Sequence, residues 1–484
     1  MNDVQLLIGG ANATAKSGAT FERRSPITGA AVSRAAAAGA DDARAACDAA
    51  AKAFPLWSAL GPNARRKLLL EAAAKLRTKS AEFSRLCVEE TGAIAGWGHF
   101  NTGFAATLLE EAAAMTTQIT GETVPSDHAG TIAMALRQPA GVCVGMAPWN
   151  APVILGVRAI AMPLACGNTV VLKASELCPG THRLIVDAFV EAGLPPGTVN
   201  YVTHSAADAP AVVEALIAHP AVKRVNFTGS SRVGRIVGEL AGKHLKPCLL
   251  ELGGKAPLLV LEDADLDEAV AAAAFGAFMH QGQICMSTER IIVVEKIADE
   301  FTKRFIAKVK TLAVGDPTKG NFPIGACVDT RTVDHVKALM ADATAKGARI
   351  VTGGSGSGGA FFEPTVLDGV QQGMRIYSEE SFGPIVGILR ARDVDHAVEL
   401  ANDSEYGLSA AVFSRDLNTA LTVAQRIDSG ICHVNSSTVQ DEAQMPFGGT
   451  KASGLGRFGG KAGIAEFTDL RWISISTGHR HYPI

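Results

Sequence analysis

The sequence predicts an α/β protein with doubly wound parallel sheets, divided into two or three domains. Its 484 residues exceed what one hydrophobic core usually supports. Apolar residues make up 47% of the chain and charged residues 19%, so the chain can bury a large core. From about residue 140 onward, short β-branched runs alternate with apolar segments of helical spacing, which is the pattern of repeated βαβ units.

Two helices are expected before this alternation begins, over residues 40–60 and 63–92. Asp41 and Asp42 favour the start of the first helix, and Asn63 is the expected cap of the second. Leucines and alanines recur at helical spacing in the second segment, which indicates one buried face.

The alternating region predicts two consecutive series of strands and helices. In the first series, strands are expected over residues 141–145, 168–172, 198–202, 222–227, 247–250 and 257–261, with helices over 153–164, 179–193, 207–218 and 231–243. In the second, strands are expected over 290–295, near 349 and over 384–389, with helices over 297–313, 331–346 and 395–403. Strands that alternate in this way with helices of about 10–15 residues form parallel sheets.

The charge pattern excludes several classes of partner. The formal net charge is −3 and there is no run of basic residues, so neither nucleic acid nor an anionic membrane is an expected partner. Asp3 stands where a signal peptide needs positive charge. The longest strongly apolar stretch, residues 269–279, is shorter than the ~18 residues of a membrane span. We therefore expect a cytoplasmic protein.

The chain contains nine cysteines, and no two of them have C-x-x-C spacing. An odd number in a large chain fits reduced thiols better than a disulfide framework. No metal site is expected, because His479 and His481 lie in the tail, where histidines are usually solvated. Cys285 differs from the other cysteines, since a polar, glycine-containing loop leads into it.

Cys285 and Glu251 together indicate covalent catalysis. The cysteine follows an alanine-rich helical segment, and Glu251 ends a strand and is followed by two glycines. A thiol nucleophile and a carboxylate base at the ends of elements suit a reaction through a thioester. The alternative is that Cys285 is a small core residue, as most cysteines are.

Three further motifs follow strands. Gly229, in residues 227–234 (FTGSSRVG), joins a strand to a helix whose free N–H groups favour a pyrophosphate. Residues 173–176 (KASE) carry an acid that can accept hydrogen bonds from ribose hydroxyls, and Asn150 can donate to an oxyanion. Taken singly, each motif also fits a turn or a solvated ion pair.

Seven motifs in order identify a family. They are residues 148–150 (PWN), 173–176 (KASE), 227–230 (FTGS), 251–255 (ELGGK), 282–285 (GQIC), 379–384 (EESFGP) and 446–449 (PFGG). Over essentially the whole chain, this series resembles the NAD(P)-dependent aldehyde dehydrogenase superfamily. With less specificity, residues 456–460 (GRFGG) and 478–484 (GHRHYPI) resemble its bacterial aromatic aldehyde dehydrogenases, of the vanillin, salicylaldehyde and benzaldehyde type.

The resemblance implies a mechanism and a set of residues. Cys285 would add to the aldehyde carbon, Asn150 and the Cys285 backbone N–H would hold the oxyanion, and Glu251 would activate water to hydrolyse the thioester. The cofactor would be NAD, with NADP less preferred. The implied cofactor-binding residues are Pro148, Trp149, Lys173, Ser175, Glu176, Gly229, Ser230, Gly234, Leu252, Glu380 and Phe382.

The implied substrate tunnel is mostly apolar, and its expected residues are Ile154, Leu155, Arg158, Met279, Ile284, Met286, Val439 and Phe447. Arg158 suits a flat ring that bears an oxygen substituent, the carboxylate of a semialdehyde, or a surface ion pair. Phe458 stands where much of the superfamily has an acid, so we expect Glu251 to work with water and without a carboxylate relay.

The fold implied by the resemblance has two doubly wound α/β domains and a small β oligomerisation element. The NAD-binding domain would span residues 1–120 and 140–252, the catalytic domain 253–450, and the bridging element 121–139 and 451–484. The bridging element would pair subunits in a homodimer, or in a homotetramer as the alternative. The functional alternatives are a semialdehyde or aliphatic aldehyde dehydrogenase, a CoA-acylating dehydrogenase, a cysteine hydrolase without cofactor and a non-catalytic structural protein.

Overall fold

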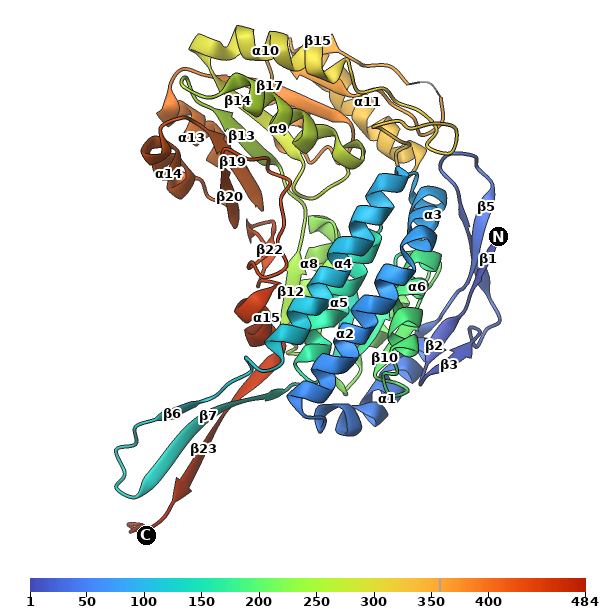
Figure 1. Cartoon of the computed structure of the whole chain (residues 1–484), viewed down its shortest axis with the longest axis vertical. Coiled ribbons are helices and arrows are strands. Elements are labelled where there is room, and N and C mark those ends of the chain that lie inside the picture. Colours follow the sequence, from blue (N-terminus) through green and yellow to red (C-terminus); the bar gives the residue numbers. More distant parts are fainter. Residues whose placement is uncertain (357) are drawn as a thin grey trace.

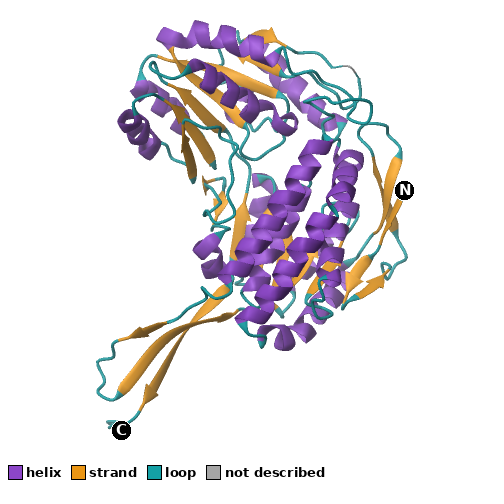
Figure 2. Cartoon of the chain, in the orientation of Figure 1, coloured by secondary structure: helices purple, strands orange, loops and turns teal. Residues whose placement is uncertain are grey.

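The computed structural model describes residues 1–356 and 358–484. Figure 1 shows two α/β bodies and an arm that extends from the lower one. Each body contains a central sheet with helices packed on it, and the arm is built of strands (Figure 2). The doubly wound α/β class expected from the sequence is therefore confirmed.

The first sheet has eight strands in the order β22-β12-β11-β8-β9-β10-β2-β3. They are β2 (Leu6–Ile8), β3 (Ala11–Ala13), β8 (Val142–Met146), β9 (Thr169–Lys173), β10 (Val199–Val202), β11 (Val222–Thr228), β12 (Cys248–Glu251) and β22 (Gly454–Leu455). Strands β8 to β12 pair in parallel, and β2, β3 and β22 add antiparallel edges. Three short strands make a separate sheet in the order β1-β5-β4: β1 (Asn2–Val4), β4 (Thr20–Arg24) and β5 (Ala31–Ala36).

Nine helices accompany the first sheet in the described residues. They are α1 (Ala40–Ser58), α2 (Pro62–Thr78), α3 (Ser80–Thr91), α4 (Ala95–Met115), α5 (Pro152–Ala165), α6 (Pro179–Glu191), α7 (Ala209–Ala218), α8 (Ser231–Lys243) and α15 (Gly460–Glu466). Helix α5 is buried along its whole length between the sheet and α4, which explains its almost uniformly apolar sequence. Arg158 is its one charged side chain.

The second sheet has seven strands in the order β15-β16-β17-β14-β13-β19-β20. They are β13 (Ala256–Val260), β14 (Thr288–Val294), β15 (Arg349–Thr352), β16 (Thr365–Asp368), β17 (Ile385–Ala391), β19 (Ser409–Phe413) and β20 (Ile431–Val434). Its helices are α9 (Leu266–Phe278), the 3-10 turn η1 (Met279–Gly282), α10 (Glu295–Val309), α11 (Thr330–Ala345), α12 (Arg375–Ser378), α13 (Val394–Asn402) and α14 (Leu417–Arg426). A small ribbon pairs β18 (Tyr406–Gly407) with β21 (Thr450–Lys451).

Two sheet edges face each other, and this juxtaposition positions the site. Met146, Lys173 and Phe227 are aligned by strand register at the carboxyl edge of the first sheet, and the next residue, Thr228, pairs with Glu251. Strand β13 follows β12 after four residues, so the amino edge of the second sheet begins beside Glu251. The loops before β14 and β17 reach the same edge. Residues after the strands of the first sheet therefore lie beside residues before the strands of the second sheet, and the site forms between them.

The arm is a three-stranded sheet in the order β23-β7-β6. Its strands are β6 (Glu122–Val124), β7 (Thr131–Pro139) and β23 (Thr468–Ser476), all paired antiparallel. Residues 454–455 of the tail pair instead with β12 of the first sheet, so the tail joins the arm only from Thr468. Across residues 1–356 and 358–484, no helix is long and apolar enough to cross a bilayer.

Two expectations about the helices were wrong. The helix expected over residues 63–92 is two helices, α2 and α3, which are separated at Lys79. Asn63 does not cap α2, because Gly61 caps it and Pro62 takes the first position, where a missing N–H costs nothing. Helix α4 and strands β16, β19 and β20 were not expected. Helix α4 packs against α2, α3 and α5, so its apolar residues surround the helix and leave no clear stripe.

Candidate active site

A strained loop presents the Cys285 thiol. His280, Gln281 and Gly282 have φ values of 50°, 58° and 69°, a left-handed run that only glycine adopts freely. A Cβ on Gly282 would lie 2.2 Å from the Gly383 carbonyl oxygen, so this position has no room for a side chain. The Gln281 amide donates to the Ala326 carbonyl at 2.6 Å and fastens the loop to the body. The loop therefore holds the thiol in one place.

Glu251 ends β12 and faces this thiol. A Cβ on Gly254 would lie 2.5 Å from the Cys285 carbonyl oxygen, so the glycines after Glu251 permit the close approach of the two segments. The Glu251 side chain is almost fully buried, and in the described chain no hydrogen-bond donor binds either carboxylate oxygen. Burial raises its pKa to about 7, although the nearby Arg158 charge opposes the shift. A carboxyl group with this pKa can exchange a proton near neutral pH.

The surroundings of Cys285 favour its thiol form over the thiolate. Burial and the neighbouring Glu251 carboxylate raise its pKa well above the usual value. Because thiolate is the nucleophilic form, the thiol needs a proton acceptor when it reacts. Glu251 is the neighbouring carboxylate that can accept this proton.

Asn150 lies beside both residues, in the loop between β8 and α5. Its side chain is 4% exposed and lines two cavities, one on each side of Cys285. The indole N–H of Trp97 donates to the Asn150 backbone carbonyl at 2.9 Å. The structure thus brings together the three side chains expected to be catalytic.

The first cavity, of about 280 Å³, lies over the carboxyl edge of the first sheet. It is lined by Pro148, Trp149, Asn150, Thr228, Gly229, Ser230, Glu251, Gly253, Cys285, Glu380 and Phe382. Ser230 caps α8 by accepting from the Val233 N–H, and the amino end of this helix faces the cavity, as pyrophosphate sites require. A Cβ on Gly229 would lie 2.4 Å from the Phe227 ring. These residues fit a dinucleotide cofactor.

Five other expected cofactor residues lie outside this lining. Lys173 ends β9, the neighbour of β8 at the same sheet edge, and Ser175 and Glu176 follow it. Gly234 and Leu252 pack against each other, because a Cβ on Gly234 would lie 2.3 Å from a Leu252 methyl group. These two residues hold α8 against the end of β12.

A buried ion pair supports Glu380, and the sequence reasoning missed it. Lys255 donates to Glu289 at 2.7 Å, and Glu289 accepts from the backbone N–H groups of Ser381 and Phe382 at 3.0 and 3.1 Å. This contact fixes the loop, in which Phe382 has a left-handed φ of 43°. Glu380 accepts from the Gly254 N–H at 2.9 Å, and burial raises its pKa to about 8.

The second cavity, of about 340 Å³, lies on the other side of Cys285 and is mostly apolar. All eight residues expected in the substrate tunnel line it. The lining residues that were not expected are Trp97, Phe100, Phe104, Ala151, Phe275, Gln440 and Asp441. Trp97, Phe100 and Phe104 recur at i, i+3 and i+7 of α4, so recognising that helix would have identified them.

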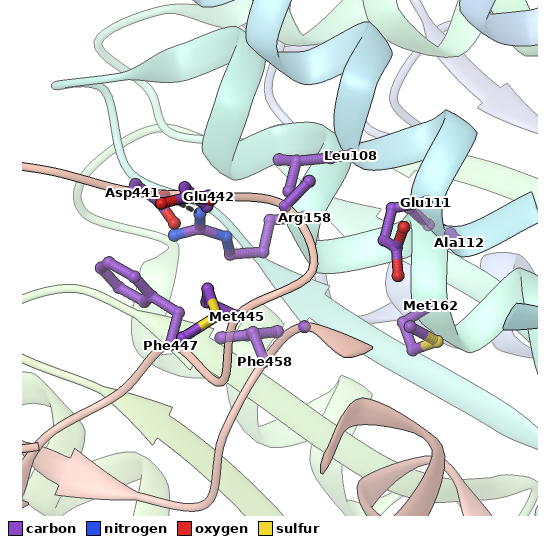
Figure 3. Close-up of a pocket in the computed structure, with 13 residues that line it drawn as sticks. Leu108, Glu111, Ala112, Arg158, Met162, Asp441, Glu442, Met445, Phe447 and Phe458 are labelled. Atoms are coloured by element: carbon purple, nitrogen blue, oxygen red, sulfur yellow. Dashed lines mark hydrogen bonds and ion pairs between the residues drawn. The ribbon is translucent and has the colours of Figure 1, made fainter. Parts of the chain in front are cut away.

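Arg158 forms an ion pair with Asp441, and its guanidinium lies 4.3 Å from the centre of the Phe447 ring. Figure 3 shows the pair and Phe447 among the residues that line a small neighbouring cavity. Both side chains are largely buried, so the pair is not on the surface. A cavity of about 30 Å³ beside Arg158 is lined in part by Phe458 (Figure 3). Position 458 therefore provides an aromatic ring here and no carboxylate.

Known proteins resemble this chain over its full length. A model of the aldehyde dehydrogenase family matches residues 13–473. Vanillin dehydrogenase of Pseudomonas fluorescens is 60% identical over 484 residues, which are 100% of each chain. Salicylaldehyde dehydrogenase of Pseudomonas sp. strain C18 is 50% identical over 465 residues, which are 96% of each chain.

A solved structure shares the whole fold. The crystal structure of a salicylaldehyde dehydrogenase from Pseudomonas putida G7, complexed with salicylaldehyde, has a TM-score of 0.98 at 48% identity and covers 100% of both chains. With the family model and the full-length relatives, this likeness settles the family. The chain belongs to the aldehyde dehydrogenase family, enzymes that act on small aldehydes with NAD(P).

Proposed function

We propose that this protein oxidises aromatic aldehydes to carboxylic acids with NAD. The observation that carries the proposal is the second cavity, because its aromatic and aliphatic walls end at the Cys285 thiol. Trp97, Phe100 and Phe447 give it flat surfaces that suit a ring, and 340 Å³ is enough for one substituted ring. The names of the vanillin and salicylaldehyde dehydrogenases among its relatives support the same class.

In the first half of the reaction, the Cys285 thiol passes its proton to Glu251 while sulfur adds to the aldehyde carbon. The Asn150 amide stabilises the oxyanion of the resulting thiohemiacetal, a contribution that typically amounts to ~10²–10³ in rate for one donor. The residues that line the first cavity would hold the cofactor, which would supply a hydride acceptor for the thiohemiacetal carbon, so that a thioester remains on Cys285.

In the second half, Glu251 releases its proton and then takes one from water. The hydroxide adds to the thioester carbon, the carboxylic acid leaves, and the sulfur is protonated again. The pKa of about 7 allows Glu251 to hold a proton in the first half and to act as a base in the second. The buried Phe458 provides no carboxylate relay, so the proton leaves through water.

The Arg158–Asp441 pair defines the polar part of the slot. Asp441 already compensates the Arg158 charge. The carboxylate of a semialdehyde would therefore gain little from Arg158 and would be repelled by the Asp441 carboxylate. A ring hydroxyl can instead donate to Asp441 and accept from Arg158. This arrangement favours hydroxylated aromatic aldehydes over semialdehydes.

A panel of aldehydes tests the proposal. We expect kcat/KM, measured from the absorbance of the reduced cofactor, to be highest for salicylaldehyde and vanillin, lower for benzaldehyde and lowest for propanal and succinic semialdehyde. A preference for succinic semialdehyde would overturn the substrate class, and the Cys285 chemistry would remain.

The preference for NAD over NADP is proposed from Glu176. This acid follows β9 at the sheet edge where the adenosine ribose is expected, and a 2′-phosphate there would meet its carboxylate. We expect kcat/KM for NAD to exceed that for NADP. In the Glu176→Gln variant, the ratio of kcat/KM for NAD to kcat/KM for NADP should be smaller. Equal efficiency of the wild type with both cofactors would contradict this role.

The assembly proposed is a homodimer formed through the arm. Strand β23 is an edge strand, and exposed apolar side chains on it give a neighbouring subunit a surface to cover. A homotetramer, formed by pairing two such dimers, is the alternative.

A further inference from the structure

Trp97 contacts three parts of the active site. Its indole N–H donates to the Asn150 carbonyl at 2.9 Å, in a buried hydrogen bond between α4 and the loop after β8. Its ring stacks on His280, with centroids 4.8 Å apart and planes 13° from parallel, and on Phe100 at 5.6 Å. The same ring lines the substrate cavity. A residue that only formed the cavity wall would not need the hydrogen bond to Asn150 or the stacking on His280.

This hydrogen bond is one anchor of the loop that carries Asn150. Asn150 lies between the end of β8 at Met146 and the start of α5 at Pro152, and Pro152 has no N–H with which to anchor the loop. Trp97 binds the carbonyl of Asn150 itself and so restrains the backbone from which the Asn150 side chain projects. An error of about 1 Å in such a group can cost ~10² in rate.

His280 fixes the other side of the indole without charge. Burial lowers the pKa of its imidazole to about 3, so the ring is neutral at any working pH. In the described chain neither of its ring nitrogens has a hydrogen-bond partner, which leaves stacking on Trp97 as its main contact. His280 also belongs to the left-handed run before Cys285. The indole is therefore held between the nucleophile loop and the oxyanion loop.

We infer that Trp97 is a positioning residue for the oxyanion site, acting through the Asn150 carbonyl, in addition to its place in the substrate wall. The inference rests on the proposed function in one respect, the assignment of the Asn150 amide to the oxyanion. It predicts an effect on the rate of the chemical step that does not depend on whether the aldehyde has a ring.

Trp97→Phe removes the N–H and keeps an aromatic side chain. We expect the single-turnover rate of cofactor reduction to fall about 10-fold for benzaldehyde and for propanal alike, with little change in KM. Replacing Trp97 with 3-benzothienylalanine, which keeps the bicyclic ring and has sulfur in place of N–H, should give the same loss if the phenylalanine variant folds poorly. A loss confined to KM for aromatic aldehydes, or no loss, would overturn the inference.

Trp57→Phe is the matched control. Trp57 is another buried tryptophan, and its indole N–H donates to the Leu164 carbonyl at 3.2 Å, at the far end of α5. This variant loses an equivalent hydrogen bond, so its melting temperature should fall to a similar degree while the single-turnover rate stays unchanged. Equal rate losses in the two variants would show that Trp97 acts only through general stability.

A double-mutant cycle with Asn150→Ala tests the route of the effect. Asn150→Ala should slow the chemical step by about 10²–10³, and adding Trp97→Phe to it should cost nothing further, because the amide is already gone. If the two substitutions instead slow the chemical step additively, and the wild type oxidises aldehydes, the inference about Trp97 is overturned and the proposed function stands. A wild type that fails to oxidise aromatic aldehydes would count instead against the proposed function.

Discussion

Cys285 and Glu251 are two acidic groups in contact, and the Glu251 carboxylate raises the cost of a negative charge on the thiol. Burial raises the pKa of both, to about 7 for Glu251 and well above the usual value for the thiol. Only one negative charge is therefore present near neutral pH, and it resides on the carboxylate until the thiol reacts. Transfer of one proton moves this charge to sulfur without bringing a second anion into the site.

Removal of the thiol tests its role as the nucleophile. We expect Cys285→Ala to reduce aldehyde-dependent cofactor reduction by about 10⁴-fold or more, because no other group can form the thioester. Cys432→Ala, at a half-buried cysteine of β20, is the control and should retain activity. Near-normal turnover in Cys285→Ala would exclude the covalent mechanism.

The raised pKa of Glu251 gives a prediction about pH. Below about pH 7 the carboxyl group keeps its proton and cannot act as a base, so the rate of thioester hydrolysis should rise between about pH 6 and pH 8 and then level off. Glu251→Gln should remove this dependence and lower kcat by about 10²-fold or more. Because Glu251 also accepts the thiol proton, rapid mixing should show that cofactor reduction in the first turnover is slowed as well. A pH profile unchanged by the substitution would assign the base to another group.

At the level of elements, the site is assembled from loops that precede or follow strands, and one buried ion pair holds two of these loops. Lys255 precedes β13, and Glu289 lies in β14 and reaches the loop before β17. The pair is almost fully buried, and the backbone N–H groups of the loop complete the coordination of the Glu289 carboxylate. The loop geometry thus depends on a charge that does not touch the cofactor cavity.

Glu289→Gln leaves the Lys255 charge buried without a partner. We expect the variant to be less stable by about 3 kcal/mol. We also expect its KM for NAD to rise several-fold with a smaller change in kcat, because Glu380 is no longer held in place. Chemical denaturation and cofactor titration measure the two effects. Glu268→Gln, at an exposed acid in the first turn of α9, serves as the control. An unchanged KM for NAD would show that the loop is fixed by other contacts.

The elements also show what sequence reasoning can and cannot predict. Motifs at strand ends, such as that of Glu251, are local, and the parallel topology brings such ends to one edge of the sheet. Much of the lining of the first cavity could therefore be predicted from the sequence. Asp441 could not be predicted, because its partner Arg158 lies 283 positions away in a different element. Helix α4 was missed since it is buried on several sides, and Trp97 was missed with it.

At the scale of the whole molecule, the arm is difficult to explain in a single chain. It extends from the lower body as a three-stranded sheet (Figure 1). On β23, Leu470 and Trp472 are 63% and 79% exposed, and alternation along the strand places both on one face. An edge strand with exposed apolar side chains is prone to pair with another chain unless a partner covers it. The geometry therefore favours an assembly in which a second subunit covers this face.

Charged substitutions on that face test the assembly. Wild-type protein is expected to have twice the mass of one chain by light scattering after gel filtration, or four times in the tetrameric alternative. The Leu470→Lys/Trp472→Lys variant should run as a monomer, because covering two lysines with an apolar partner surface would cost several kcal/mol. Arg471→Ala, whose side chain points from the opposite face of β23, should leave the mass unchanged. A wild type that is monomeric at micromolar concentration would show that the arm serves another purpose. A double variant that stays dimeric would place the interface on another surface.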